Sequence, residues 1–596
     1  MKGVWHEISE ATAEALAAAL GAGSDRPEGT GASSPVWVVR QGRPVEVGRD
    51  WSLVLEDGGI LEGTGQLPAS LPLGYHRLAF DDRQVLVVVA PDRCHLPDDL
   101  RAWLLAVQVY ALRSSDSWGI GDLHDLGTVG RWARREGAGM VMVNPLHAVL
   151  PGLPQQSSPY SPSSRIWRNP IYIRPEEAPG AAGAGPVLEP LAAAARRLLG
   201  ERRIDRDAVW LAKSDALEHL HQASSNDPRF LGWRAAAGDA LERYAIFCSL
   251  SERFGRPWQS WPSQYRMPSH PEVAHFASSA AERVTYHAWL QWVVELQLEK
   301  ANAEVPLLAD LAVGADPDGA DAWSYQECFA QGARIGAPPD EFNTLGQDWG
   351  LVPFDPWKLR TAEFAPYISA IRANLRYAGG LRVDHVMGFW RQWWVPLGAG
   401  GATEGAYVRY PAEEMLDILA LESVRAGAVI VGEDLGTVEA GVREELAERG
   451  VLSSKVALFE SEPPRTWPRQ ALGSFSTHDL PTIAGLLDGS DLAAQERIGL
   501  RPDSGANAAA RRKIVEWAGA EQPDQAATNL AGALAASPCA LVAVTLEDAT
   551  GVPERPNMPG TTDTWPNWSL ALPMPLDELL GSDGLRALVE RLRENR

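Results

Sequence analysis

From about residue 104 onward, short apolar runs alternate with stretches in which hydrophobic residues recur at helical spacing. Eight of these runs have the length of a β-strand. They are LLAVQVYAL (104–112), GMVMVNPL (139–146), VPLLADLAV (305–313), GLRVDHV (380–386), AVIVGEDL (428–435), KVALFE (455–460), ALGSFSTHD (471–479) and ALVAVTLED (540–548). Eight strands alternating with helices are typical of a closed parallel barrel. We therefore predict the α/β class, with a (β/α)8 TIM barrel.

The N-terminal part has a different pattern. Residues 8–20 have helical spacing, and residues 21–35 are rich in Gly, Ser and Pro, as in a linker. Within residues 36–90, the β-rich runs VWVVR, WSLVLE, YHRLAF and VLVVVA are separated by Gly, Pro and Asp. This spacing predicts a small antiparallel β-sandwich before the barrel. We assign residues 1–95 to an N-terminal module consisting of a helix and this sandwich.

The remaining residues, 96–596, are assigned to the barrel, with one long insertion between its second and third strands. Residues 176–196 are rich in Ala, Gly and Pro and predict a surface loop that leads into a helix. Helical periodicity then continues through DALERYAIFCSLSERFG and YHAWLQWVVELQLEKAN. We therefore predict a largely helical insertion at about residues 176–300.

Composition and charge narrow the range of partners. The 596 residues carry a net charge of −23, which argues against nucleic acid and favours a neutral substrate. The four cysteines lie far apart without a CxxC pair, as expected of reduced thiols in the cytoplasm. No apolar run is long enough to span a membrane, and the N-terminus lacks a signal-peptide pattern. We expect a cytoplasmic protein without a membrane partner.

Three carboxylates stand at the ends of three predicted strands. Asp384 lies in LRVDH, Glu433 in VIVGEDLG and Asp479 in FSTHDLPT. The C-terminal ends of barrel strands converge on the face where barrel enzymes carry out chemistry. Retaining glycosidases need two carboxyl groups about 5 Å apart, which neighbouring strands can supply. Together the three acids predict cleavage of glycosidic bonds.

Each acid also has a structural interpretation. Arg382 would lie on the same side of its strand as Asp384, which suits an ionised nucleophile but equally a structural ion pair. Glu433 follows an apolar run that would raise its pKa, as a general acid requires, yet an acid there also suits a helix N-terminus. Asp479 adjoins His478, a donor for sugar hydroxyls, but Asp479 also fits a helix cap.

Other motifs indicate no metal and no cofactor. The twelve histidines form no cluster with metal-ligand spacing, and no phosphate loop, HExxH or GxSxG motif occurs. WGIGDLHDL (118–126) lacks the full GxGxxG spacing of a nucleotide site. SPYSPSS (158–164) either presents Tyr160 to a substrate ring or is a plain surface loop. GAPPDEFNTLGQDWG (336–350) predicts a long loop, which is either a functional lid or structural.

Together these segments resemble the amylomaltases, also called 4-α-glucanotransferases (glycoside hydrolase family 77). They follow the family order over roughly residues 105–570: VYALRSSDSWGIGDL, SPYSPSSRIWRNPIYI, LLADLAVGAD, GAPPDEFNTLGQDWGL, LRVDHVMGFWRQWWVP, EGAYVRYPAEEMLDILALES, VIVGEDLGTV, STHDLPT and PGTTDTWPNW. LPLGYHRL and APDRCHLP also resemble the longer bacterial subgroup, which has a β-sandwich module before the barrel. The resemblance implies a (β/α)8 barrel with insertions and no cofactor.

The resemblance also implies roles for individual residues. Asp384 matches the family nucleophile, Glu433 the general acid/base and Asp479 the third acid, which holds sugar hydroxyls and distorts the ring. The remaining matches are expected to bind substrate, with Asp310 either structural or at the rim of the site; they are Tyr160, Asp310, Gln347, Trp349, Arg382, His385 and His478.

The expected activity is that of a 4-α-glucanotransferase. It would transfer a segment of an α-1,4-glucan or maltooligosaccharide to the 4-hydroxyl of an acceptor such as glucose or maltose, with retention of configuration. Two alternatives are an α-amylase-like hydrolase, in which water replaces the acceptor, and a glucan-binding protein without catalysis.

Overall fold

Eight parallel strands close a barrel in the computed structural model of this chain, which describes residues 7–21, 34–339 and 345–596. Around the barrel they are β6 (Ala102–Val107), β7 (Met140–Val143), β10 (Leu307–Leu311), β13 (Gly380–Val383), β16 (Val429–Gly432), β17 (Leu452–Val456), β18 (Ala471–Ser474) and β19 (Leu541–Thr545). All eight predicted strands are confirmed. The sixth begins and ends earlier than predicted: residues 457–459, placed in the strand by the prediction, form a turn in which Phe459 is exposed.

The chain forms two compact units, and each contributes strands to the barrel. One unit contains Met1–Pro97 and Leu311–Ser453, and the other contains Asp98–Asp310 and Ser454–Arg596. The two units are described one after the other.

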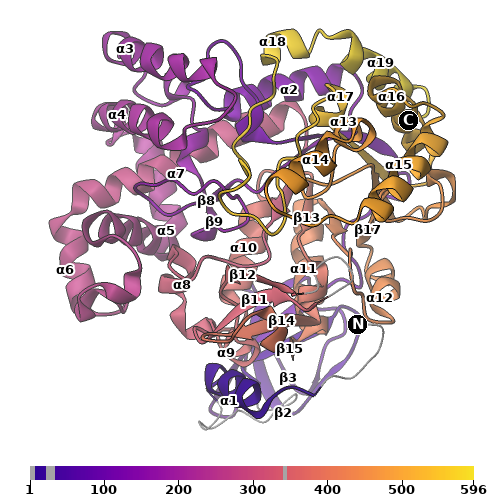
Figure 1. Cartoon of the computed structure of the whole chain (residues 1–596). Helices are drawn as coiled ribbons and strands as arrows, with labels where there is room; N and C mark the ends of the chain where they lie inside the picture. Colours follow the sequence, from indigo (N-terminus) through magenta and orange to yellow (C-terminus); the bar gives the residue numbers. More distant parts are fainter. Residues whose placement is uncertain (1–6, 22–33, 340–344) are drawn as a thin grey trace. The chain divides into compact units, whose positions relative to one another are not determined.

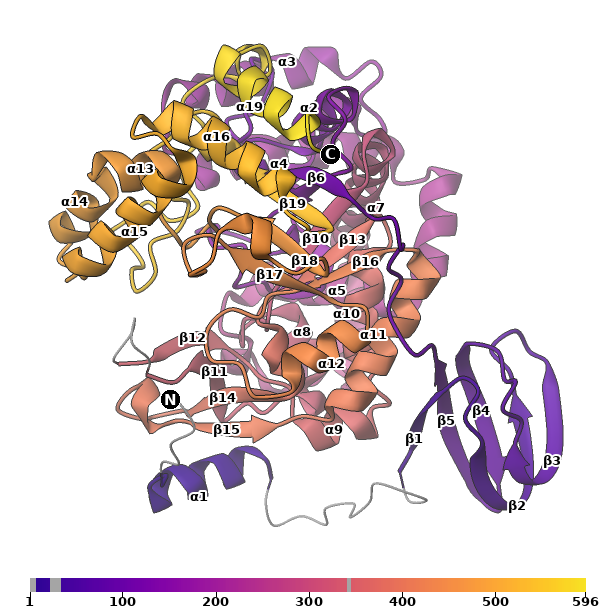
Figure 2. The same ribbon diagram turned by 90° about the vertical axis from the view of Figure 1, so that its right-hand side faces the viewer.

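The first unit begins with α1 (Glu10–Ala19) and a five-stranded sheet, shown in Figure 2. The sheet has the order β1 (Val36–Arg40), β5 (Arg83–Ala90), β4 (Gly74–Phe80), β2 (Val45–Val54) and β3 (Ile60–Leu67). The strand β3 was not predicted, because its Gly-Thr-Gly stretch interrupts the hydrophobic alternation. The pairing is mixed rather than wholly antiparallel, since β1 runs parallel to β5. The predicted linker falls mostly at residues 22–33, outside the described residues.

Side chains of the N-terminal sheet make partly buried polar contacts with α11 (Ala412–Ala426), the helix that precedes β16. Arg40 Nε donates to Asp417 Oδ1 at 3.1 Å, and Tyr75 Oη donates to Glu422 Oε1 at 2.6 Å. Both acceptor residues are buried. Each buried carboxylate depends on its partner, because removal of the partner would leave the carboxylate uncompensated.

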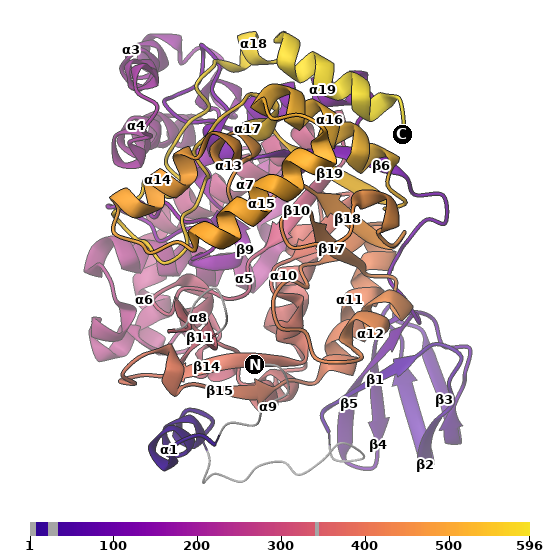
Figure 3. The ribbon, with the colours of Figure 1, turned by 45° about the vertical axis from the view of Figure 1, so that its right-hand side comes forward.

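A second sheet of the first unit corrects the expectation of a long loop at residues 336–350. Its order is β12 (Gln347–Leu351), β11 (Ala333–Ala337), β14 (Arg391–Pro396) and β15 (Ala406–Arg409), and α1 packs against β14 (Figure 3). Antiparallel pairing with β14 makes β11 a strand despite its glycine and the prolines that follow it. Gln347 and Trp349 therefore lie on a strand, β12. The remaining helices of the unit are α8 (Ala320–Ser324), α9 (Pro356–Thr361), α10 (Ala365–Leu375) and α12 (Val442–Glu448).

The second unit is rich in helices (Figure 1). They are α2 (Leu123–Arg135), α3 (Gly185–Arg196), α4 (Arg206–Ser224), α5 (Pro228–Phe254), α6 (Pro271–Ser279), α7 (Ala281–Glu304), α13 (Ile483–Asp488), α14 (Ser490–Arg497), α15 (Ser504–Ala518), α16 (Pro523–Ala536), α17 (Leu546–Ala549), α18 (Leu576–Leu579) and α19 (Asp583–Arg593), with a small β8 (His147–Ala148) and β9 (Ser164–Arg168) pair. The helix α7 packs on α2 and leads directly into β10. None of the helices that the structure describes has the length and apolar character needed to cross a bilayer.

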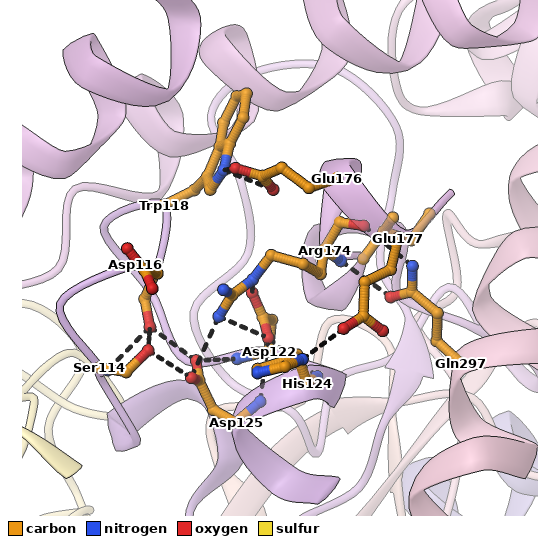
Figure 4. A network of polar contacts seen from close by, with 12 residues as sticks. Ser114, Asp116, Trp118, Asp122, His124, Asp125, Arg174, Glu176, Glu177 and Gln297 are labelled. Atoms are coloured by element: carbon orange, nitrogen blue, oxygen red, sulfur yellow. Dashed lines mark hydrogen bonds and ion pairs between the residues drawn. The ribbon is translucent and has the colours of Figure 1, made fainter. Parts of the chain in front are cut away.

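A buried ionic network joins the start of α2 to the segment that follows β9 (Figure 4). Asp122 caps α2 and forms a reciprocal capping box with Asp125. The guanidinium of Arg174 contacts Asp122 Oδ2 at 2.5 Å and Asp125 Oδ1 at 3.1 Å. Burial, and then the charge of Asp122, raise the pKa of Asp125 to about 6. The segment 118–126 therefore begins a helix around an internal ion pair.

Candidate active site

Arg382 and Asp384 lie on the same side of the chain at the end of β13. Arg382 is buried, and its Nη1 contacts Asp384 Oδ1 at 3.1 Å. The backbone N–H of Asp384 donates to the carbonyl oxygen of Leu311 at 3.1 Å, which holds the residue at the strand end. A guanidinium this close favours the ionised carboxylate and restricts its rotation.

Glu433 follows β16, the strand next to β13 in the barrel. The two strands pair in parallel with Val383 opposite Gly432, and the backbone N–H of Glu433 donates to the carbonyl oxygen of Val383 at 3.0 Å. The Glu433 carboxyl accepts two backbone N–H groups, from His385 at Oε2 and from Leu435 at Oε1, both at 2.9 Å. These donors fix the direction in which the carboxyl group points.

The protonation of Glu433 is set by its surroundings. Burial is the largest cause, and together with the charge of Asp384 it raises the pKa of Glu433 to about 7, against the opposing effect of Arg382 and the two backbone donors. A carboxyl group with this pKa is partly protonated near neutral pH, as general acid catalysis requires.

His385 connects Glu433 to the second sheet of the first unit. Its φ of 48° places it in the left-handed region, which non-glycine residues rarely adopt. Its ring meets Trp349 of β12 edge-on, with 5.3 Å between ring centroids, and Trp349 Nε1 donates to Gln347 Oε1 at 3.1 Å. Burial, with Arg391 nearby, lowers the pKa of His385 to about 4, so this ring is neutral at neutral pH.

In the second unit, Tyr160 links two of the predicted residues. Its hydroxyl donates to Oδ2 of the buried Asp310 at 2.6 Å and lies 3.3 Å from His478 Nδ1. The rings of Tyr160 and His478 are 4.7 Å apart between centroids. Tyr160 therefore belongs to a polar cluster at strand ends and is not part of a plain surface loop.

One carboxylate oxygen of Asp479 accepts a hydrogen bond from a residue that the sequence analysis did not identify. Asn557 Nδ2 donates to Asp479 Oδ1 at 2.7 Å, and His478 Nε2 lies 3.4 Å from Asp479 Oδ2. The Asp479 side chain is 44% exposed, so solvent or a ligand can reach it.

Trp568 is a second residue that the sequence analysis missed. Its ring lies against both Tyr160 and His478, with centroid distances of 5.3 and 5.0 Å. Its φ of 58° is also left-handed. The only signal for it was its place in the segment PGTTDTWPNW, in which no single residue had been given a role.

The described residues contain no group of three or more His, Cys, Asp or Glu that could hold a metal ion. The first unit combines an ion-paired carboxylate with a carboxyl group whose pKa burial raises to about 7, at the ends of adjacent barrel strands. A barrel with such side chains at its strand ends is typical of carbohydrate-active enzymes that act on glycosidic bonds.

Comparison with known proteins specifies the family. The family model for 4-alpha-glucanotransferase (glycoside hydrolase family 77) matches residues 107–576, and a model of the MalQ N-terminal beta sandwich domain matches residues 34–91. The chain is 41% identical to a 4-alpha-glucanotransferase of Mycobacterium tuberculosis, over 90% of this chain and 82% of the relative. It is 30% identical to a 4-alpha-glucanotransferase of Haemophilus influenzae, over 88% of this chain and 84% of the relative.

Solved structures of amylomaltases have the same fold as this chain. Amylomaltase from Corynebacterium glutamicum superposes with a TM-score of 0.87 at 29% identity, covering 99% of this chain and 96% of that one. Amylomaltase from Streptococcus agalactiae in complex with acarbose has the same fold, with a TM-score of 0.66 at 19% identity, covering 82% of this chain and 98% of that one.

The chain belongs to the 4-alpha-glucanotransferase family. Its activity is that of a transferase, and neither alternative, a glucan hydrolase or a non-catalytic glucan-binding protein, is favoured by these matches. The predicted fold, with a β-sandwich module before the barrel, is confirmed as well.

Proposed function

We propose that Asp384, Glu433 and Asp479 carry out a retaining double displacement on α-1,4-glucans. Glu433 donates its proton to the glycosidic oxygen while Asp384 attacks the anomeric carbon. The bond from that carbon to the leaving glucan breaks, and a bond to the Asp384 carboxylate forms. The leaving glucan departs with the proton from Glu433.

In the second half of the reaction, the 4-hydroxyl of an acceptor attacks the anomeric carbon. Glu433 now accepts the hydroxyl proton, the bond to Asp384 breaks, and a new α-1,4 linkage forms with retention. We propose glucose, maltose and longer maltooligosaccharides as acceptors. Asp479 is the third acid, which holds hydroxyl groups of the distorted sugar.

The observation that carries this proposal is the different state of two carboxyl groups on adjacent strands. Arg382 supports an ionised Asp384, whereas burial raises the pKa of Glu433 to about 7. A nucleophile and a general acid need these opposite protonation states at the same pH. The proposed substrate-binding residues are Tyr160, Asp310, Gln347, Trp349, Arg382, His385 and His478.

We propose the same division of the chain as the sequence indicates, with a module at residues 1–95 and a catalytic domain at 96–596 that carries a helical insertion at about 176–300. A cytoplasmic location is also part of the proposal. Four buried, free cysteines, Cys94, Cys248, Cys328 and Cys539, suit a reducing compartment.

Incubation of the purified protein with maltotriose tests the proposal. Transfer yields glucose and a ladder of longer maltooligosaccharides while the number of reducing ends stays constant. A rise in reducing ends with shorter products only would mean that water, not a sugar, is the acceptor. Absence of any product from maltotriose and from longer maltooligosaccharides would contradict the assignment of Asp384, Glu433 and Asp479.

A further inference from the structure

The segment that leads into α4 lies against the loop that carries Trp568. Arg203 forms an antiparallel bridge with Leu570. The backbone N–H of Ile204 donates to the carbonyl oxygen of Ser569 at 2.8 Å. The start of α4 is therefore held beside the residues that directly follow Trp568.

Arg206, the first residue of α4, reaches this loop with a buried guanidinium group. Its Nη1 donates to the Ser569 hydroxyl at 3.1 Å, and its Nη2 donates to the carbonyl oxygen of Trp568. The guanidinium also lies over the ring of Tyr110, in the turn after β6, at 5.2 Å from the ring centroid. Hydrogen bonds from a cation are stronger than those between neutral groups, and aromatic faces attract cations. Arg206 therefore ties the Trp568 loop to α4 and to the end of β6.

The partners of Arg206 are all uncharged. Among the described residues, no carboxylate lies within ion-pair distance of its guanidinium, and its contacts are a carbonyl oxygen, a hydroxyl group and an aromatic ring. Burial of a cation costs free energy unless hydrogen bonds offset the loss of water. The bonds to Trp568 and Ser569 supply this compensation, so the guanidinium and the loop fix each other's position.

Trp568 needs support of this kind because its backbone is strained. Its φ of 58° lies in the left-handed region, which bulky residues rarely adopt, and such a conformation persists only where the surrounding structure holds it. Arg206 binds the Trp568 carbonyl oxygen, and the Trp568 N–H donates to the carbonyl oxygen of Pro556 at 2.8 Å. Contacts on both backbone polar groups therefore fix the direction of the Trp568 side chain.

The Trp568 ring packs on two residues that are proposed to bind the sugar. Its centroid lies 5.3 Å from that of Tyr160 and 5.0 Å from that of His478, and those two centroids are 4.7 Å apart. Trp568 is buried, whereas Tyr160 and His478 are partly exposed. The indole ring therefore supports both residues from their buried side.

The residue after Arg206 contacts the loop that leads to Tyr160. Asp207 Oδ1 accepts the backbone N–H of Gln155 at 2.7 Å. Two adjacent residues at the start of α4 thus contact the loops that carry Tyr160 and Trp568, two of the three rings in the cluster.

We propose that Arg206 is a positioning residue for the transfer reaction. By fixing the backbone of Trp568, it holds the ring on which Tyr160 and His478 rest when they bind the sugar at the cleavage point. The proposal rests on the reaction and on the substrate-binding residues proposed above. It gives the start of α4 a function in substrate binding that is exerted through Trp568.

The test is the measurement of kcat and KM for maltotriose, followed by glucose release and referred to the amount of folded protein. In Arg206→Met we expect KM to rise about fivefold and kcat/KM to fall about 10-fold or more, because small displacements of substrate-holding groups have large effects on rate. A purely structural function would lower the melting temperature and the amount of folded enzyme but would leave KM unchanged. A folded Arg206→Met variant with the KM of the unaltered protein would overturn the proposal.

Arg206→Lys is the conservative variant. Its ammonium group keeps the buried charge but lacks the planar fork that lets arginine bind two acceptors at once, so we expect a KM between those of the unaltered protein and Arg206→Met. If Arg206→Met does not fold, Arg206→Lys takes its place, and an unchanged KM in that variant would overturn the proposal in the same way.

Arg202→Met is the matched control. Arg202 pairs with Glu554 at 2.9 Å, and its Nε donates to the carbonyl oxygen of Ala571 at 3.1 Å, so it joins the same two parts of the chain without a contact to Trp568. We expect its KM to equal that of the unaltered protein. An equal rise of KM in Arg202→Met and Arg206→Met would overturn the proposal, because general loosening of the loop would then explain both.

A double-mutant cycle tests the route through Trp568. Trp568→Ala, or Trp568→Leu if the alanine variant does not fold, should raise KM by itself. Adding Arg206→Met should then change KM little further, because the ring that Arg206 positions is already gone. Effects that multiply would overturn the proposal. If Asp384→Asn transferred glucan as fast as the unaltered protein, the proposed reaction itself would be wrong, and that result does not depend on Arg206.

Discussion

The backbone N–H of His385 donates to Glu433 Oε2 at 2.9 Å, although the two residues follow different barrel strands. His385 adopts a left-handed backbone, at a cost of about 1–2 kcal/mol for a non-glycine residue. His385 comes directly after Asp384, so the residue that follows the proposed nucleophile also orients the proposed general acid. Local backbone strain of this kind is common where catalytic groups must be held in one direction.

The first prediction concerns the need for a proton donor. Glu433→Gln should lower the rate of transfer from maltotriose by on the order of 100-fold or more, because the leaving sugar oxygen loses its acid. Release of fluoride from α-maltosyl fluoride should fall much less, since fluoride needs little protonation to leave. Equal losses with both donors would show that Glu433 is not the general acid. The comparison is made on kcat/KM for the two donors.

The nucleophile gives a second prediction. Asp384→Asn should lower the transfer rate by roughly three orders of magnitude or more, for both maltotriose and maltosyl fluoride, because the amide cannot form the covalent intermediate. The nearly isosteric change should leave the melting temperature close to that of the unaltered protein. A variant that still disproportionates maltotriose at a comparable rate would exclude Asp384 as nucleophile.

The buried network of α2 leads to a prediction about stability. Arg174→Met removes the cation between Asp122 and Asp125, both fully buried, and should lower the free energy of unfolding by about 3–5 kcal/mol. Arg131→Met is the matched control, since Arg131 pairs with Glu304 at 3.1 Å on the half-exposed surface. That pair should contribute at most about 1 kcal/mol. Thermal or denaturant unfolding gives the free energy of unfolding of the two variants. If both variants lost a similar amount, burial would not be what makes the Arg174 ion pairs more stabilising than the Arg131 pair.

The barrel could be predicted from sequence because its strands are short apolar runs with sharp polar ends. Asp384 and Glu433 were identifiable for the same reason, since each is the first acid after such a run. The strands β3, β11 and β12 could not be predicted. Gly63 and Gly65 interrupt the alternation in β3, and β11 is held by pairing with β14, more than fifty residues further along the chain. Tertiary pairing decides such segments, not local propensity.

The part of the site that sequence reasoning missed lies in a segment without regular structure. Asn557 and Trp568 belong to residues 550–575, which contain no helix or strand of the kind that places a side chain by periodicity. Their positions depend on contacts within the folded chain, such as the hydrogen bonds from the backbone N–H of Asn557 to the carbonyl of His478 and from that of Trp568 to the carbonyl of Pro556. A family resemblance can point to such a segment, but only geometry selects the residues.

The raised pKa of Glu433 gives a last prediction, on stability as a function of pH. Burial raises the pKa of this carboxyl from the usual range of a glutamic acid to about 7 in the folded protein. Between the two pKa values the unfolded chain has lost the proton and the folded protein keeps it, so the unfolded state is favoured increasingly as pH rises. The stability contribution of Glu433 is therefore fully present below about pH 4 and is lost as pH rises through about 7.

Glu433→Gln removes this titration while keeping a similar shape. We expect the variant to be more stable than the unaltered protein near pH 8, by roughly 1–3 kcal/mol, with the difference shrinking as the pH falls toward about 5. Urea unfolding of both proteins across this range measures the difference. A constant difference at every pH would show that the pKa of Glu433 is not raised by folding, and the variant's lower activity would then have to arise from shape alone. A difference that grows with pH, in a variant that is both more stable and less active, would instead indicate that the protein gives up stability to keep a protonated acid beside Asp384.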